Sequence, residues 1–270
     1  MSTYVIAEIG INHNGSLETA MRLIDAAKEA GCDAVKFQAR TVELVYTPEE
    51  LAKPRESVFG ATNGDLKRGL EFSVDQFRDI DGYCHDAGID WSASCWDGQS
   101  VARIAAFNPP WLKIPSALIT NMALLDAYRD TGISCFLSTG MSTDKEVATA
   151  MRVLGGQAIP LACTSTYPCP PAELNLRYVR TLIGLYGAAG FSSHCVSPWP
   201  VLGAVALGAS VIEAHLTLDR TLWGSDQSSS LEPKSFKKMV EEIRTLETAL
   251  GDGKKIVYPS EIPIREKLRR

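Results

Sequence analysis

Two histidines and one carboxylate give the first indication of chemistry in this sequence. His194 ends the apolar run GFSSH, His215 ends the run IEAH, and Asp226 follows in the segment GSDQSSSLEP. Two neutral imidazoles and a carboxylate suit a divalent transition metal that keeps open coordination positions. The alternative is a pair of ordinary buried histidines. Their repeated placement at the ends of predicted strands favours the metal site.

Eight strand-like runs must position these residues, and each is followed by a helix-like stretch. The alternation predicts parallel strands joined by crossover helices, and eight such units close into a (β/α)8 TIM barrel. The alternative is an open doubly wound sheet, but no G-x-G-x-x-G motif follows the first run, which disfavours a dinucleotide site. We expect a catalytic barrel over 1–251 and a tail over 252–270. The predicted strands are 4–10, 33–38, 89–96, 111–116, 133–139, 158–165, 188–194 and 209–217.

Helix signals fix several of the connections. Ser16 is a predicted cap, and the pair Ser73 and Gln76 is a predicted capping box. Further helices are expected from about Glu173 and from Pro233 to about Leu250. The segment 39–72 reads as irregular and too long for an ordinary connection, which predicts a lid or a wall.

Every predicted strand ends in polar or charged groups, which is where barrel enzymes place functional side chains. Lys36 and Lys113 would point into one mouth, and buried lysines are rare unless they are paired or bind an anion. With several hydroxyls alongside, they predict a cradle for phosphate and carboxylate groups. One alternative is that a lysine pairs with Glu8 or Asp97 and only fixes the rim. Another is a Schiff-base lysine of an aldolase.

Composition narrows the possible partners. The chain has 270 residues, 45% of them hydrophobic, and a formal net charge of −5, which argues against a nucleic-acid surface. No apolar run has the length of a membrane span, and no signal peptide is recognisable. The seven cysteines are scattered, so we expect reduced thiols in a cytoplasmic protein, and Cys163 and Cys169 are discounted as metal ligands.

Several motifs resemble the sialic acid synthase (N-acetylneuraminate synthase) family over about residues 4–251. They are AEIGINHNG, VKFQ, LKIPS, STGMST, CTSTYP, the S-x-H of GFSSHC, ALGASVIEAHLTLDR and the SDxxxSLEP stretch. The resemblance implies a transferase that joins phosphoenolpyruvate to the open-chain aldehyde of an N-acyl amino sugar such as N-acetylmannosamine. The product is a 2-keto-3-deoxy acid of the nonulosonic, sialic type, and phosphate leaves by C–O cleavage. The resemblance also implies Mn²⁺ or Mg²⁺ as cofactor and a homodimer.

The same resemblance assigns roles to individual residues. His194 and His215 are the implied metal ligands. Glu8, Tyr167 and Asp226 are the implied catalytic residues that face the water and the sugar. The implied phosphoenolpyruvate-binding residues are Lys36, Gln38, Ser94, Lys113, Ser116, Ser138, Ser165 and Ser192.

The sequence also departs from the family pattern. Leu118 stands where the family has a glutamate, Ser193 where it has an acid, and Ala214 where it has a lysine. Most members carry a C-terminal antifreeze-like domain, and we expect the tail over 252–270 not to include one. These departures keep two other functions open: a non-catalytic homologue that binds phosphoenolpyruvate or a sugar, and a metal-dependent aldolase. If the enzyme has changed its acceptor, Leu118 is expected to be an apolar wall.

Overall fold

The structure, a computed structural model, describes residues 2–269, and a closed parallel barrel lies at its centre. The order around the barrel is β1-β10-β9-β8-β7-β6-β5-β2, so the predicted (β/α)8 TIM barrel is confirmed. The barrel strands are β1 (Tyr4–Gly10), β2 (Ala34–Ala39), β5 (Asp90–Cys95), β6 (Leu112–Ile114), β7 (Cys135–Ser138), β8 (Ala158–Cys163), β9 (Gly190–Ser193) and β10 (Val211–His215).

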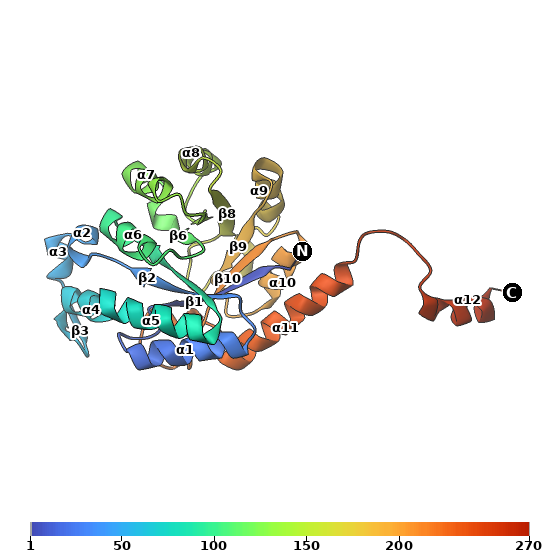
Figure 1. Cartoon of the computed structure of the whole chain (residues 1–270), viewed down its shortest axis with the longest axis horizontal. Helices are drawn as coiled ribbons and strands as arrows, with labels where there is room; N and C mark the ends of the chain where they lie inside the picture. Colours follow the sequence, from blue (N-terminus) through green and yellow to red (C-terminus); the bar gives the residue numbers. More distant parts are fainter. Residues whose placement is uncertain (1, 270) are drawn as a thin grey trace.

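Helices surround this barrel, as Figure 1 shows. Their local signals act as predicted: the Ser16 side chain accepts from the backbone of Thr19, and Ser73 forms a capping box with Gln76. The helix predicted from about Glu173 is present but begins later, at Tyr178, because Pro171–Glu173 forms only a 3-10 turn. The surrounding helices are α1 (Leu17–Glu29), α5 (Val74–Ala87), α6 (Gly98–Ala105), α7 (Met122–Asp130), α8 (Asp144–Leu154), α9 (Tyr178–Tyr186), α10 (Trp199–Ala206) and α11 (Pro233–Leu250).

Successive side chains along each barrel strand point alternately outward and inward, and this separates two hydrophobic clusters from the polar end of the barrel. Outward-facing residues such as Val5 and Ala7 pack against the helices and form the large core. Inward-facing residues at the amino-terminal end, including Ile6, Trp111 and Phe136, fill the bottom of the barrel. The inward positions at the other end are therefore the ones left for chemistry.

The strand register brings the polar residues together at that end. Glu8 on β1 lies opposite Lys36 on β2 and opposite His215 on β10. Ser94 lies opposite Lys113. Residues that are far apart in the sequence thus become neighbours through backbone pairing alone.

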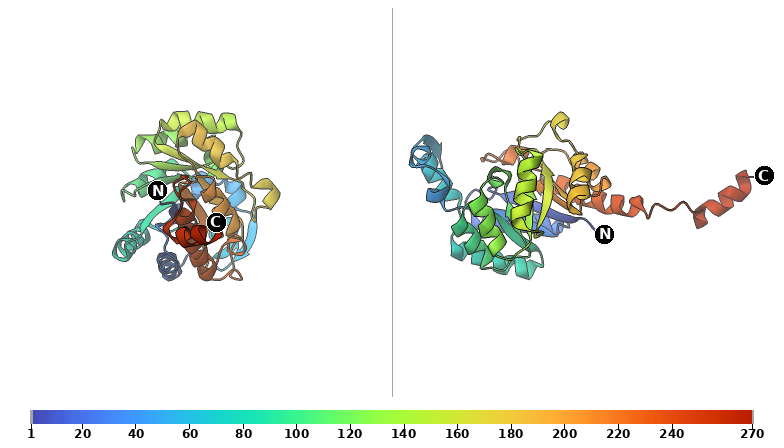
Figure 2. Two further views of the ribbon diagram at one scale, coloured as in Figure 1. Left: turned by 90° about the vertical axis from the view of Figure 1, so that its right-hand side faces the viewer. Right: turned by 90° about the horizontal axis from the view of Figure 1, so that it is seen from above.

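The segment 39–72 is folded, so the expectation of an irregular connection is wrong. Residues 42–70, here named the arm, contain α2 (Val42–Val45), α3 (Pro48–Leu51), the hairpin β3 (Pro54–Ser57) and β4 (Gly60–Thr62), and α4 (Asn63–Leu70). A capping box between Thr62 and Asp65 begins α4. The arm projects from the carboxyl-terminal side of the barrel, as Figure 1 and the right-hand view of Figure 2 show.

The chain beyond α11 leads away from the barrel. An extended segment follows Leu250 and ends in a short helix, α12 (Ile262–Leu268), which lies apart from the rest (Figure 2). Within residues 2–269, no helix combines the length and the apolar character needed to cross a membrane.

Candidate active site

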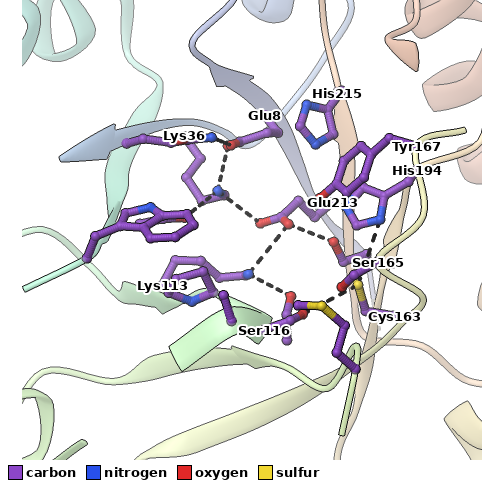
Figure 3. Close-up of a pocket in the computed structure, with 18 residues that line it drawn as sticks. Glu8, Lys36, Lys113, Ser116, Cys163, Ser165, Tyr167, His194, Glu213 and His215 are labelled. Atoms are coloured by element: carbon purple, nitrogen blue, oxygen red, sulfur yellow. Dashed lines mark hydrogen bonds and ion pairs between the residues drawn. The ribbon is translucent and has the colours of Figure 1, made fainter. Parts of the chain in front are cut away.

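One cavity of about 310 Å³ lies at the carboxyl-terminal mouth of the barrel (Figure 3). Every predicted site residue except Asp226 lines it, although they come from all eight barrel strands or the loops after them. This volume is at the lower end of the range for small-molecule sites, which is about 300–1,000 Å³. The structure therefore brings the predicted set together, and the individual roles stay predictions.

The two lysines point into this cavity, as expected. Lys36 Nζ lies 2.6 Å from a Glu8 carboxylate oxygen and donates to Ser94 Oγ at 2.6 Å. Lys113 Nζ donates to Ser138 Oγ at 2.7 Å. Both lysines are buried, and Lys36 pairs with Glu8 as the rim-fixing alternative anticipated.

Asp97, the other partner considered for a lysine, has a different task. Its carboxylate accepts from the backbone of Ser100 at 2.9 Å and so caps α6. It also accepts from the backbone of Thr41, the residue just before the arm, at 2.6 Å. Asp97 is therefore a structural residue, which leaves Lys113 without that partner.

Glu213 is the central residue that sequence reasoning missed. Its carboxylate lies between the lysines, with one oxygen 3.6 Å from Lys113 Nζ and the other 3.7 Å from Lys36 Nζ. Ser192 Oγ donates to it at 2.7 Å. The sequence could have predicted this residue. Side chains alternate along a strand, so if His215 points into the barrel, the residue two positions before it must point inward as well.

The environments of Glu8 and Glu213 push their pKa values apart. Burial raises the pKa of Glu8 to about 7, with Lys36 opposing the rise and Glu213 adding to it. Burial also acts to raise the pKa of Glu213, but Lys113 and Lys36 outweigh it and lower that pKa to about 2. Glu213 therefore stays a carboxylate, whereas Glu8 can exchange a proton near neutral pH.

Serine hydroxyls complete the cradle because one glycine lets them approach. The backbone N–H of Gly140 donates to Ser116 Oγ at 3.1 Å. A Cβ atom at position 140 would lie only 2.1 Å from Ser165 Oγ, so any larger residue would displace that hydroxyl. The turn of the STGMST motif thus shapes the anion side of the cavity.

The two imidazoles lie side by side, with ring centres 5.5 Å apart. His194 Nδ1 is 2.8 Å from the carbonyl oxygen of Thr164. A carbonyl only accepts, so Nδ1 carries the hydrogen, and in the neutral ring Nε2 keeps its lone pair. Burial lowers the pKa of His215 to about 4, and its Nδ1 is buried without a hydrogen-bond partner. Burial acts to lower the pKa of His194 as well, but Cys163 and the carbonyl of Thr164 outweigh it and raise that pKa. In their neutral forms the two rings each offer a nitrogen that could bind a divalent cation.

The carboxylate expected beside these rings is that of Asp226, and its charge acts to raise the pKa of His215 against the effect of burial. Asp226 does not line the cavity, and its carboxylate accepts from Ser225 Oγ at 2.7 Å. Between residues 2 and 269, no three His, Cys, Asp or Glu side chains are grouped closely enough to hold a metal ion. Tyr167, in contrast, lies against the imidazoles, with its ring centre 3.9 Å from that of His194.

Several further lining residues were not predicted. Cys163 Sγ lies 3.9 Å from His194 Nδ1 and 3.8 Å from Ser116 Oγ. Its position at the end of β8 could have identified Cys163 as a lining residue, but the apolar residues beside it in the sequence suggested a buried structural cysteine. An apolar wall bounds the mouth of the cavity and consists of Trp96, Pro115, Ala117 and Met141.

The three departures from the family pattern lie outside the cavity lining. Leu118 packs against the large hydrophobic core, so the expectation that it forms the apolar wall is wrong; Pro115 and Ala117 do so instead. Ala214 is buried in the same core, because the alternation of β10 turns it away from the cavity. Ser193 is buried at the corresponding outward position of β9.

Comparisons with known proteins agree with this arrangement. The NeuB family pattern matches residues 23–255, and the chain belongs to the NeuB family. The resemblance to sialic acid synthases, and with it the expectation of a synthase, is confirmed.

Particular relatives make the relationship concrete. The human N-acetylneuraminate-9-phosphate synthase is 38% identical over 98% of this chain and 76% of its own length. The N,N'-diacetyllegionaminic acid synthase of Legionella pneumophila is 34% identical over 100% of this chain and 79% of its own. The crystal structure of an N-acetylneuraminic acid synthetase from Leptospira borgpetersenii superposes with a TM-score of 0.87, at 33% identity, over 100% of this chain and 93% of that chain.

Proposed function

We propose that this enzyme condenses phosphoenolpyruvate with the aldehyde of an N-acyl amino sugar, forming a 2-keto-3-deoxy nonulosonic acid and releasing phosphate. The observation that carries the proposal is one cavity in which two buried lysines and several serine hydroxyls adjoin two imidazoles. Family membership supports the same reaction, because relatives are synthases of sialic, legionaminic and pseudaminic acids. The proposal includes a cytoplasmic homodimer, in keeping with seven cysteines that form no disulfide.

The lysine side of the cavity suits the donor substrate. Phosphoenolpyruvate carries a phosphate and a carboxylate, and Lys36 and Lys113 are the two buried cations that would meet them. Glu213 lies within ion-pairing distance of both ammonium groups and favours their charged forms, although burial still lowers the pKa of Lys113. Hydroxyl donors at the strand ends would orient the anion, namely Ser94, Ser116, Ser138, Ser165 and Ser192.

The imidazole side of the cavity suits the aldehyde. His194 and His215 would hold Mn²⁺ or Mg²⁺, which supplies Lewis-acid polarisation of a carbonyl oxygen when bound. In the reaction, C3 of phosphoenolpyruvate bonds to the aldehyde carbon, a water oxygen adds at C2, and the C2–O bond to phosphate breaks. Burial raises the pKa of Glu8 to about 7, so Glu8 is assigned the proton exchange. Lys113 would stabilise the charge on the departing phosphate.

The acceptor end of the site is where relatives are expected to differ. The human and mouse relatives are named for a product that carries a phosphate, whereas the Legionella relative is not. Tyr167 and Asp226 are assigned to the sugar, from the loops after β8 and β10. The apolar wall opposite them would contact the acyl or carbon-bound hydrogens of the sugar.

Phosphate release from phosphoenolpyruvate with Mn²⁺ tests this proposal across a panel of amino-sugar and plain sugar aldehydes. We expect phosphate and a 2-keto-3-deoxy acid in equal amounts, and a Lys113→Ala variant with a higher KM for phosphoenolpyruvate and a lower kcat. Pyruvate release from a nonulosonic acid without phosphate chemistry would instead identify an aldolase. Substrate binding without turnover would identify a binding homologue.

A further inference from the structure

Two cysteines meet behind the wall of the candidate active site. Cys169 lies in the loop after β8, two residues beyond Tyr167, and Cys195 directly follows His194 at the end of β9. The rings of Tyr167 and His194 pack against each other and face the cavity (Figure 3). Neither Cys169 nor Cys195 lines that cavity. The two cysteines therefore sit just behind two side chains of the site.

The backbone holds these two cysteines next to each other. The N–H of Cys169 donates to the carbonyl oxygen of His194 at 3.1 Å. That carbonyl belongs to the planar peptide unit that ends at the α carbon of Cys195, so the hydrogen bond places the two cysteines on adjacent stretches of chain. Hydrogen-bonded backbones in sheets lie about 4.8 Å apart. This spacing is within the range of about 4.4–6.8 Å between α carbons that disulfides usually need.

The side chains of the two cysteines also interact. Cys195 Sγ donates to the carbonyl oxygen of Cys169 at 3.2 Å. Burial raises the pKa of the Cys195 thiol to about 11, and the adjoining side chain of Cys169 adds to the rise. The buried thiols of Cys95 and Cys135, in contrast, donate to carbonyls two residues earlier in their own segments. Rotation of the two side chains, without movement of either loop, can therefore bring Cys169 Sγ and Cys195 Sγ together.

The two thiols differ in how easily an oxidant can reach them. Cys169 is buried, whereas Cys195 is only partly buried, and both are free thiols in this structure. A small disulfide such as oxidised glutathione can therefore react at Cys195 first. Cys169 is then in place to displace glutathione from the mixed disulfide.

We propose that Cys169 and Cys195 form a reversible disulfide under oxidising conditions, and that this bond fastens the loop after β8 to the end of β9. Two S–H bonds break and one S–S bond forms, while oxidised glutathione takes up both protons and both electrons and leaves as two molecules of reduced glutathione. The bond holds the segment that carries Tyr167 against the segment that carries His194. It forms whether or not the cavity condenses phosphoenolpyruvate.

Thiol counting and mass spectrometry test the pairing. The folded protein is equilibrated with oxidised glutathione at mildly alkaline pH, because thiols with a raised pKa exchange slowly at neutral pH. We expect two of the seven thiols to be lost, and trypsin to release peptides 153–177 and 181–220 joined by a bond that dithiothreitol breaks. Peptide 153–177 also contains Cys163, so Cys163→Ala should keep this cross-link and Cys169→Ser should lose it.

Thermal unfolding measures what the bond does to the fold. The bond closes the chain from 169 to 195, which includes α9 and β9, and a cross-link over a loop of that length should raise Tm by at least about 5 °C over the reduced protein. Cys169→Ser should show no such rise with oxidised glutathione. Cys32→Ser, which removes a buried cysteine outside the pair, should show the same rise as the wild type.

The outcomes decide the pairing and its effect separately. Retention of all seven thiols, glutathione adducts without a cross-link, or a cross-link through Cys163 overturns the pairing. A cross-link between Cys169 and Cys195 that leaves Tm unchanged overturns the fastening of the two segments. A cross-link that raises Tm and is reversed by dithiothreitol supports both.

Discussion

Replacing Glu213 by glutamine tests how the cavity balances its charges. The substitution keeps the shape of the side chain and its contact with Ser192, but it removes the carboxylate that lies 3.6 Å from Lys113 Nζ and 3.7 Å from Lys36 Nζ. Lys36 keeps Glu8 as a partner at 2.6 Å. Lys113 is left buried without any carboxylate within ion-pairing distance among the described residues.

The magnitude follows from these distances. At an effective dielectric constant of about 20, each pair supplies about 4 kcal/mol of Coulomb attraction, and the burial of the charges offsets part of it. Breaking a buried ion pair by removing one partner costs about 3–5 kcal/mol. We therefore expect the free energy of unfolding of Glu213→Gln to be lower than that of the wild type by about 3–5 kcal/mol.

Phosphoenolpyruvate should reduce this difference, because its anionic groups then partner both lysines. Urea unfolding with and without saturating phosphoenolpyruvate measures the effect, with Glu241→Gln on the exposed surface of α11 as control. If phosphoenolpyruvate reduces the stability difference by about 1.4 kcal/mol, the variant binds phosphoenolpyruvate about tenfold more tightly than the wild type does. A stability loss below about 1 kcal/mol, or a difference that phosphoenolpyruvate does not reduce, would refute the assigned role of Glu213.

Three further predictions address the metal, pH and Leu118. Calorimetry of His215→Ala should show Mn²⁺ binding more than about 100-fold weaker than in the wild type. Loss of a residue that only supports a metal ligand weakens binding by about 10–100-fold, and loss of the ligand itself should cost more. The control His85→Ala should bind Mn²⁺ as the wild type does. Burial lowers the pKa of His13 to about 3, so its stabilising contribution is present above about pH 6.5 and is lost as pH falls. Below that pH the free energy of unfolding of the wild type should therefore fall as pH falls, and urea unfolding of His13→Gln should show this fall reduced by up to about 1.4 kcal/mol per pH unit. Leu118→Glu should cost about 1–3 kcal/mol in the same assay and gain no activity with N-acetylmannosamine; gained activity would place residue 118 in the site after all.

Much of the fold was readable from the sequence because local signals carried it. The alternation of runs predicted the barrel, and α11 spans Pro233–Leu250 as its proline and glycine signals indicated. The arm was missed, since its helices and strands are only a few residues long and show no sustained period. The false helix start at Glu173 has a similar cause, because a 3-10 turn begins with the same residue types.

The candidate site was likewise predicted only in part from the sequence. The sequence alone determined which residues stand at strand ends, because the carboxyl ends of parallel strands meet at one edge, and so it predicted Lys36, Lys113, His194 and His215 together. Only the tertiary structure decided which partner each group meets. Glu213 lies between two lysines and Leu118 turns into the core because of barrel register and packing, and these are set by contacts between residues distant in sequence.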